Sequence, residues 1–432
     1  MCEDPRPAGP ALPPAGPHAR PGRGTDDALA RRDDAPTPRP TTTDDGGREL
    51  LAWLRDMRHH HPVHEDEYGA FHVFRHQDVL AVASDPSLYS SQLSRLRPGS
   101  QALSEQILSV IDPPMHRTLR RLVSQAFTPR TVADLEPRVT ELATHLLDAV
   151  EGDTFDLITD FAYPLPVIVI AELLGVPPSD RTLFSSWSER MLQMQVADPA
   201  DMQFGDDAGE DYERLVKEPM RDMHAYLQGH VTDRRARPGS DLISALVAAR
   251  VEGEQLTDRQ IVEFGALLLM AGHVSTSMLL GNTVLCLKDH PDIEAAARAD
   301  RTLIPAVIEE VLRLRPPITV MARVTTRDTT LAGVKIPAGR MVVPSLLSAN
   351  HDEQVFTDPQ RLDLARDGRQ IAFGHGIHYC LGAPLARLEG RIALEALFDR
   401  FPDFTPTDGA TLRYHRDGLF GVKNLPLTVR RG

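Results

Sequence analysis

One segment near the C-terminus places a cysteine among glycines in a spacing that favours thiolate chemistry. It reads FGHGIHYCLG from Phe373 to Gly382, and a helical pattern follows it. Cys380 is therefore expected in a glycine-rich loop at the start of a helix, where backbone N–H groups and the positive helix end stabilise a sulfur anion. A buried, inert cysteine is the alternative, but it does not explain the ordered spacing of Phe373, Gly376, Cys380 and Gly382.

A thiolate in such a loop is suited to binding a heme iron. The ligand must be electron-rich, and glycines let the backbone approach the porphyrin closely. The order of these positions resembles the heme loop of the cytochrome P450 superfamily, and the resemblance extends over about residues 47–432. It implies a mainly α protein, a single large helical domain with small β-sheets, that acts as a monooxygenase on O2. It implies heme b, with Cys380 as the axial ligand of the iron.

Other positions match heme contacts of this family. His116 and Arg120 stand four residues apart on one helical face, where two cations can bind a carboxylate. The resemblance implies that they bind the heme propionates together with Arg323 and His378. The full set of implied cofactor-binding residues is Cys380, Phe373, Gly374, His378, Gly382, His116, Arg120, Arg323, Ala271 and Gly272.

A second motif is structural. Glu310 and Arg313 place opposite charges three residues apart on one helical face. In the family this pair binds a downstream arginine, which matches Arg361, and the network braces the thiolate loop. A solvated surface ion pair is the alternative.

The long helical pattern from 258 to 289 contains the expected oxygen site. In the family, small residues at Ala271 and Gly272 make room for O2, and an acid followed by an alcohol relays protons. Here Val274 occupies the acid position and Ser275 follows it. We hypothesise that Ser275 and Thr276 hold a water, helped by His273 or by a hydroxyl of the substrate. In the alternative, the hydroxyls only cap backbone carbonyls and His273 packs in the core.

Several strings, at 68–76, 126–131, 271–276 and 374–380, are similar to a narrower group, the actinobacterial macrolide oxidases of the erythromycin, tylosin and rosamicin pathways. This resemblance implies oxidation of a macrolide precursor, with the ethyl side chain of a sixteen-membered macrolactone converted through an alcohol to an aldehyde. The implied substrate contacts are Val274, Ile318, Val320, Leu419 and Phe420. Three alternatives stay open: another bulky secondary metabolite, a peroxygenase, and a non-catalytic helper of a glycosyltransferase.

We expect no flavin or reductase domain after the heme loop, and we therefore expect electrons to come from ferredoxin and ferredoxin reductase, with NADPH or NADH upstream. Arg117, Arg121, Arg387 and Arg391 flank the heme segments and predict a basic docking patch. The whole chain is acidic, with 47 Lys and Arg against 61 Asp and Glu and a net charge of −14, which argues against a nucleic-acid partner.

Three cysteines without CxxC spacing fit a reducing cytoplasm. No apolar run reaches the roughly 18 residues of a membrane span, and we expect a cytoplasmic monomer. Ten of the 35 prolines lie in the first 40 residues. That segment has almost no large apolar side chains with which to offset ordering entropy. We therefore predict a disordered tail at 1–46 and one heme-thiolate domain at 47–432.

The site residues must be positioned mainly by helices. Helical patterns are predicted at 118–127, 132–150, 160–174, 185–195, 212–235, 241–250, 258–289 and 304–314. Short strands are predicted around 68–74, 325–336 and 341–343. Two irregular polar stretches, 89–104 and 197–211, are predicted as loops, which are either mobile lids or ordinary surface loops.

Overall fold

The computed structural model describes residues 39–40, 45–96, 107–180, 182–184, 186–187, 218–367, 369–416 and 418–431. One compact unit spans Arg39–Gly432. The predicted tail at 1–46, the predicted helix at 185–195 and the predicted loop at 197–211 lie largely or wholly outside the described residues.

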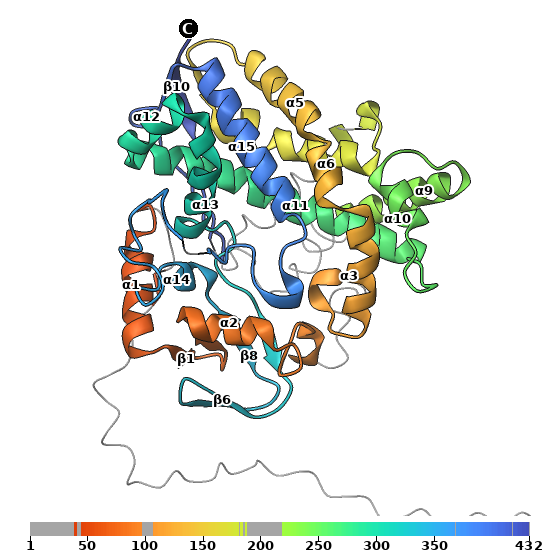
Figure 1. Ribbon diagram of the computed structural model, residues 1–432, viewed down its shortest axis with the longest axis vertical. Helices are drawn as coiled ribbons and strands as arrows, with labels where there is room; N and C mark the ends of the chain where they lie inside the picture. Colours follow the sequence, from red (N-terminus) through yellow and green to blue (C-terminus); the bar gives the residue numbers. More distant parts are fainter. Residues whose placement is uncertain are drawn as a thin grey trace, which may run out of the picture. The chain divides into compact units, whose positions relative to one another are not determined.

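Helices make up most of the compact unit. Their bounds are α1 (Arg48–His60), α2 (His76–Ser84), α3 (Met115–Ala126), α4 (Pro129–Ala133), α5 (Glu136–Asp148), α6 (Pro164–Leu174), α9 (Glu218–Ala236), α10 (Leu242–Ala248), α11 (Asp258–Asp289), α12 (Pro291–Ala299), α13 (Ile304–Leu314), α14 (Leu346–Asn350) and α15 (Ala383–Arg400). Figure 1 shows α11 running behind α15 and α13, with α5, α6, α9 and α10 on one side.

In the part of the chain that the structure describes, three small sheets accompany the helices. Their strands are β1 (Val63–Glu65), β2 (Phe71–Val73), β3 (Tyr89–Ser90), β4 (Thr154–Asp156), β5 (Arg323–Thr325), β6 (Thr329–Leu331), β7 (Val334–Ile336), β8 (Met341–Pro344), β9 (Asp403–Pro406) and β10 (Pro426–Arg430). The five-stranded sheet has the order β1-β2-β8-β5-β3, with β2 and β8 parallel. The other two sheets are β4-β10-β9 and the hairpin β6-β7.

Helix α11 is the central element of the core. A capping box fixes its first turn, because Thr257 accepts from the Gln260 backbone while the Gln260 side chain accepts from the Thr257 N–H. By length and composition α11 could cross a membrane, but 67% of its most apolar window is buried inside the protein. Burial on this scale is what the core helix of a globular domain shows.

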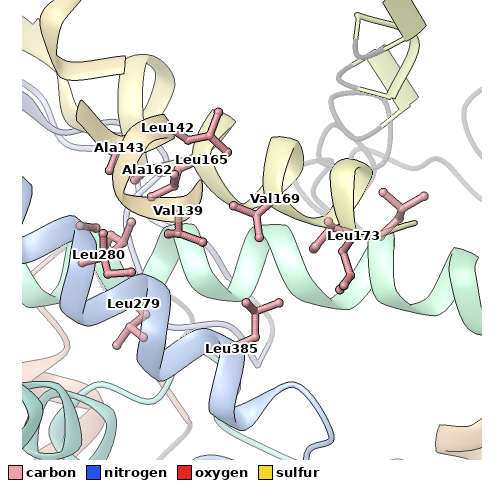
Figure 2. Packing of buried hydrophobic residues seen from close by; sticks show 14 of the residues in the cluster. Val139, Leu142, Ala143, Ala162, Leu165, Val169, Leu173, Leu279, Leu280 and Leu385 are labelled. Carbon is pink, nitrogen blue, oxygen red and sulfur yellow. The ribbon is translucent and has the colours of Figure 1, made fainter. Parts of the chain in front are cut away.

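Apolar side chains of α5, α6, α11 and α15 interlock around this helix (Figure 2). Val139 of α5, Leu165 of α6 and Leu279 of α11 are each at most 1% exposed. Gly272 lets α6 approach closely, since a Cβ there would lie 2.5 Å from Ile170 Cδ1. The packing fixes how α11 and α15, which carry the site residues, lie against each other.

The predicted elements are largely present, but prolines change their boundaries. The predicted helix at 132–150 is divided, and α5 begins at Glu136 with proline in its first turn. The predicted helix at 160–174 begins as a π-helical segment, Ile158–Ala162, and α6 starts anew at Pro164. Proline has no N–H to donate to the preceding turn, so a helix starts there more easily than it continues. The sequence did not predict α12 or α14.

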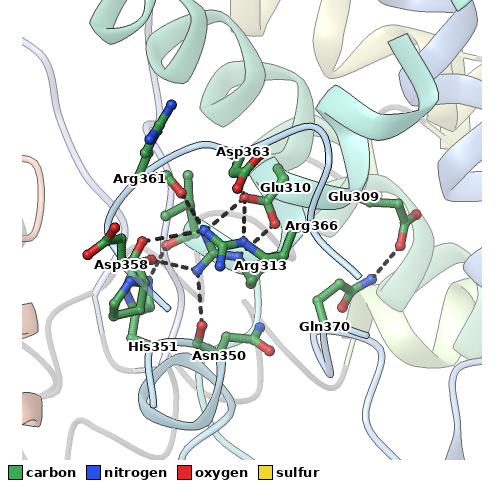
Figure 3. A network of polar contacts seen from close by, with 12 residues as sticks. Glu309, Glu310, Arg313, Asn350, His351, Asp358, Arg361, Asp363, Arg366 and Gln370 are labelled. Carbon is green, nitrogen blue, oxygen red and sulfur yellow. Dashed lines mark hydrogen bonds and ion pairs between the residues drawn. The ribbon is translucent and has the colours of Figure 1, made fainter. Parts of the chain in front are cut away.

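Arg313 of α13 is the hub of a buried polar network (Figure 3). Its side chain is 0% exposed and binds both oxygens of Glu310, at 2.7 and 2.9 Å. It also donates to the carbonyls of Asn350, Pro359 and Arg361. Every donor direction of the guanidinium is thus used, which is the condition for a tolerable buried charge.

The prediction that the Arg361 side chain is the third member of this network is wrong. Arg361 is exposed and contributes only its backbone carbonyl. The side chain that reaches Glu310 belongs to Arg366, whose Nε lies 3.2 Å from Glu310 Oε2. Arg361 and Arg366 are both in a loop, where sequence spacing does not determine side-chain direction.

The network connects directly to the cysteine loop. Asn350, whose carbonyl accepts from Arg313, also accepts from the Ile371 backbone N–H through its side-chain oxygen, at 2.9 Å. Ile371 begins the turn that leads into the loop, because the Gly374 N–H donates to the Ile371 carbonyl at 2.9 Å. The α13 ion pair therefore braces the thiolate segment.

Replacing Arg313 by Met should lower the free energy of unfolding by about 3–5 kcal/mol, since Glu310 and three carbonyls lose a buried partner. Urea unfolding followed by circular dichroism measures this change. The control is Arg237→Met, which removes an 82% exposed side chain paired with Asp233. That control should leave the midpoint almost unchanged. Equal, small shifts in both variants would contradict the bracing role.

Candidate active site

The Cys380 loop is shaped by two glycines with left-handed backbones. Gly374 has φ +73° and Gly376 has φ +71°. A Cβ on Gly376 would lie 2.4 Å from the carbonyl oxygen of Ala83 in α2. The loop closes through the Cys380 N–H, which donates to the Phe373 carbonyl at 2.9 Å. The glycines thus allow both a tight turn and close contact with α2.

Cys380 lies just before α15, whose N-cap is Gly382. The residue keeps accessible surface, yet protein atoms crowd its sulfur, and burial raises the pKa of the thiol. The backbone N–H groups of Gly382 and Ala383 and the charge of Arg120 act in the opposite direction and stabilise the thiolate. A cation bound next to the sulfur would lower the pKa of the thiol further and so favour the thiolate.

Four basic side chains gather near the loop. The rings of His116 and His378 lie 4.3 Å apart. Arg120 donates to the Tyr379 carbonyl at 2.9 Å, and Arg323 donates to the Ala322 carbonyl at 2.8 Å. The structure therefore brings together the four residues that the sequence assigned to propionate binding.

This cluster is rich in donors and poor in anions. Burial lowers the pKa of Arg120 and Arg323, and burial together with the charges of His116, Arg323 and Arg120 lowers the pKa of His378 to about 3. Asp112 is the acid that faces them, and it accepts from Ser90 Oγ and the Ser91 N–H, at 2.5 and 2.8 Å.

Among the described residues, the buried His116 Nε2 has no hydrogen-bond partner. Such a cluster fits the carboxylates of a heme, whose negative charges would restore the pKa values of these cations. Cys380 supplies the thiolate at the same place. The residues present therefore fit the cofactor that the sequence implies.

On α11, one face is accessible at the predicted oxygen site. Ala271 is exposed and Ser275, one turn later, is partly exposed, whereas Val274 is 6% exposed. The Ser275 hydroxyl donates to the Ala271 carbonyl and the Thr276 hydroxyl to the Gly272 carbonyl, each at 2.7 Å. Both hydroxyls therefore use their single hydrogen inside the helix, as in the capping alternative.

His273 is placed in the core. It is 1% exposed, its Nδ1 contacts the Leu269 carbonyl, and its ring packs edge-on against Tyr163 at 5.3 Å. Val274 likewise offers little surface to a substrate. These two residues face protein, and the accessible positions of the segment are Ala271, Gly272 and Ser275.

The predicted substrate contacts separate into two groups. Ile318 and Leu419 pair through a β-bridge, and Ile318 is 39% exposed. Val320 is partly exposed and bridges to Ser345. The prediction that Phe420 contacts the substrate is wrong. Phe420 is 2% exposed and packs in a core cluster with Leu50, Leu54, Met57, Phe74 and Leu347. Because adjacent residues of an extended segment point to opposite sides, Leu419 and Phe420 cannot both face the substrate.

Sequence reasoning assigned no role to Glu389, nine residues after the cysteine. This side chain lies in α15, is 1% exposed and hydrogen-bonds to Thr276 of α11. Burial raises its pKa to about 8, against the opposing effect of the Thr276 bond. An acid inside an otherwise apolar helix face was the available signal, but only the packing of α15 on α11 shows its partner.

Gly376→Ala should reduce both stability and heme retention more than Gly409→Ala. Both glycines have positive φ, +71° and +74°, so both variants bear a similar backbone strain of about 1–2 kcal/mol. Only Gly376 also has a backbone oxygen in the way, since nothing lies within 4 Å of a Cβ on Gly409. The measurements are urea unfolding and the absorbance of the reduced, CO-bound thiolate heme. Equal losses in the two variants would show that the contact with α2 is unimportant.

Known proteins share this architecture and sequence. The chain is 46% identical over 392 residues to the cyclomarin C epoxidase CymV of Salinispora arenicola, covering 89% of this chain and 97% of that protein. It is 45% identical over 382 residues to the erythromycin C-12 hydroxylase of Saccharopolyspora erythraea, covering 88% and 94%. A solved structure of a mutant of P450 EryK in complex with erythromycin B has a TM-score of 0.81 at 44% identity, covering 90% and 98% of the two chains.

The sequence profile of the family described as Cytochrome P450 matches residues 71–429, which is most of the chain. This range contains the thiolate loop, the cation cluster and the Glu310–Arg313 pair. The fold, the site and the relatives agree with it. The chain belongs to the cytochrome P450 family and is a heme-thiolate monooxygenase of secondary metabolism.

Proposed function

We propose that the enzyme oxidises a macrolide antibiotic precursor, at the ethyl side chain of a sixteen-membered macrolactone, through an alcohol to an aldehyde. The observation that carries the macrolide assignment is the 45% identity to an erythromycin hydroxylase over 88% of this chain. The likeness to the solved complex with erythromycin B supports it. The side-chain position rests on the resemblance of local strings alone.

When bound, the heme, which we take to be heme b, supplies O2 activation and the transfer of one oxygen atom to a C–H bond. The chain's own residues would hold and surround it. Cys380 would be the thiolate ligand, and His116, Arg120, His378 and Arg323 would hold the propionates. Ala271 and Ser275 present the accessible face of α11.

The Ile318–Leu419 pair gives a substrate an apolar contact. Its partly exposed side chains suit a bulky, mainly apolar molecule. Ser275 can still hold a water as an acceptor, because its hydrogen is bound to the Ala271 carbonyl, whereas Thr276 is 3% exposed and offers little surface to a water. His273 is not available for this task, since it faces Tyr163 and Leu269.

The alternative substrate is another secondary metabolite. The identity to the cyclomarin C epoxidase, 46%, equals that to the erythromycin hydroxylase within one per cent. A peroxygenase would be recognised by turnover with hydrogen peroxide in the absence of NADPH. We take the protein to be a monomer in the cytoplasm. The cytoplasmic assignment is supported by its three scattered cysteines, which fit a reducing compartment.

A macrolactone titration tests the substrate class. An ethyl-bearing sixteen-membered macrolactone should shift the Soret band to shorter wavelength and yield first the alcohol and then the aldehyde in mass spectrometry. Leu419→Ala should weaken its binding about tenfold, because burying a leucine contributes about 1.5–3 kcal/mol. The control is Val355→Ala, at a 46% exposed valine outside the site. A shift with cyclomarin C and none with macrolactones would overturn the proposal.

Bacterial members of this family receive electrons from a redox partner, and we propose ferredoxin with its reductase, using NADPH or NADH. The predicted basic patch is smaller than the sequence suggested. Arg121 pairs with Glu252, Arg387 with Glu309, and Arg391 with Glu136 and Glu395. Arg117 on α3 is exposed, adjacent to His116. The proposal for docking therefore centres on Arg117.

Arg117→Glu should slow reduction of the heme by ferredoxin severalfold, and the difference from the unmodified enzyme should shrink at high salt, since exposed charges are screened. Stopped-flow reduction kinetics measure it. Arg55→Glu, an exposed arginine on α1, is the matched control and should be neutral. Substrate affinity should not change in either variant. Equal rates in both variants would refute docking at Arg117.

A further inference from the structure

Asn282 is a buried polar residue on α11, outside the heme loop and the predicted oxygen site. It is 1% exposed and lies two helical turns after Ser275, which is about 10 Å along the helix axis. Its Nδ2 group donates to the Arg315 carbonyl at 2.9 Å and to the Phe420 carbonyl at 2.8 Å. Because a carbonyl oxygen can only accept, these partners identify the amide nitrogen, and they use both of its hydrogens.

The two carbonyls that Asn282 binds belong to segments that lie side by side. A β-bridge pairs Ile318 of the first segment with Leu419 of the second. Ile318 is 39% exposed and Leu419 is partly exposed, so both side chains present apolar surface. We call this pair the apolar wall. The pair contacts the substrate in the proposed function, and the role of Asn282 inferred below rests on that assignment.

Two backbone hydrogen bonds flank the apolar wall. The Phe420 N–H donates to the Pro317 carbonyl at 3.0 Å, and the Thr319 N–H donates to the Gly418 carbonyl at 2.8 Å. A short two-stranded piece of this kind is only marginally stable by itself in water. The position of the wall must therefore come from the element against which the two segments pack.

Helix α11 supplies this support through close contact. A Cβ on Gly421 would lie 2.7 Å from Met278 Cγ, and a Cβ on Gly281 would lie 3.3 Å from Val422 Cγ2. The two glycines thus let the second segment reach the helix. Met278 and Val422 are each 1% exposed, so solvent does not separate the segment from α11.

The other carbonyl that Asn282 binds is at the end of a helix. Arg315 is the C-cap of α13, and the last carbonyls of a helix have no intrahelical donor. Asn282 supplies a donor to the Arg315 carbonyl, and it binds the Phe420 carbonyl in a buried contact. A buried acceptor without a donor is costly, so one amide holds both segments in a fixed relation to α11.

We propose that Asn282 is a positioning residue that sets the distance between the apolar wall and the oxygen site. Asn282 and Ser275 are on one helix, and the wall is fixed to that helix through the Arg315 and Phe420 carbonyls. A substrate that lies on the wall therefore meets the accessible face at Ala271 and Ser275 in one register. The amide selects the carbon that is oxidised without contacting the substrate.

Hydrogen exchange in the holoenzyme tests this positioning directly. In Asn282→Leu, the amides of Phe420 and Thr319 should exchange about tenfold faster, because the two segments lose their common donor. The Cys380 amide, which donates to the Phe373 carbonyl, should exchange at an unchanged rate. Mass spectrometry with electron-transfer fragmentation resolves the single amides. Equal acceleration of all three amides would show a general loss of stability and refute the role.

The matched control is Thr283→Val. Thr283 is also 1% exposed on α11, and its hydroxyl donates to the Leu279 carbonyl at 2.7 Å. The variant therefore removes a buried hydrogen bond that stays within the helix. Exchange at Phe420 and Thr319 should remain as in the unmodified enzyme. These measurements need no substrate, so their outcome is separate from that of the macrolide assignment.

The distribution of products tests whether the wall moves relative to the oxygen site. The substrate is whichever macrolactone or cyclomarin C shifts the Soret band. Asn282→Leu should lower the share of the main product among all oxidised products severalfold, whereas Thr283→Val should leave that share unchanged. A lower total rate with an unchanged distribution of products would contradict the positioning role, because loss of folded enzyme alone has that effect.

A second variant displaces the same segment and leaves the amide in place. Gly421→Ala puts a Cβ 2.7 Å from Met278 Cγ and should push the segment away from α11. It should reproduce the faster exchange at Phe420 and the changed products, and its effects should be less than additive with those of Asn282→Leu. The control is Gly229→Ala, where nothing lies within 4 Å of the added Cβ. If both alanine variants behave like the unmodified enzyme, contact with α11 does not set the wall and the proposal fails.

Discussion

The buried Arg313 guanidinium is the interaction on which the site depends. A charge with no exposed surface is tolerable only when every donor is used, and Arg313 meets Glu310 and three backbone carbonyls. Because those carbonyls belong to α14 and to the loop that follows it, the ion pair ties the helical core to irregular chain. Asn350 passes this restraint to Ile371, where the thiolate segment begins. The loop that carries the cysteine is thereby hydrogen-bonded, through Asn350, to the helical core.

Burial shifts the pKa values of the cysteine thiol and of the nearby cations in opposite directions. Burial raises the pKa of the Cys380 thiol and lowers the pKa of the cations beside it. In each case desolvation outweighs the nearby opposite charges, which are Asp112 for Arg323, Cys380 for Arg120 and the two arginines Arg120 and Arg387 for Cys380. A heme with a metal cation and two carboxylates answers both demands at once, which explains why a thiolate and a cluster of arginines and histidines lie together.

Polar groups from two helices, α11 and α15, meet beside the site. Helix α11 has an aliphatic residue, Val274, at the position of the family's acid, and its own hydroxyls bind helix carbonyls. The acid that contacts one of them, Thr276, is Glu389 of α15, and it is buried. Burial raises the pKa of Glu389 to about 8, against the opposing effect of the Thr276 bond.

The sequence by itself determined the heme loop, the Glu310–Arg313 pair and the mainly helical fold, because each depends on spacing within one element. Side-chain partners between distant segments were decided only by the tertiary structure. Spacing could not distinguish Arg361 from Arg366, or show that Phe420 faces the core while Leu419 lies on the other side. It also gave no reason to connect Glu389 with Thr276, more than a hundred residues away. The physical reason is that loop side chains and helix-to-helix contacts are fixed by packing, which brings together residues that no local periodicity relates.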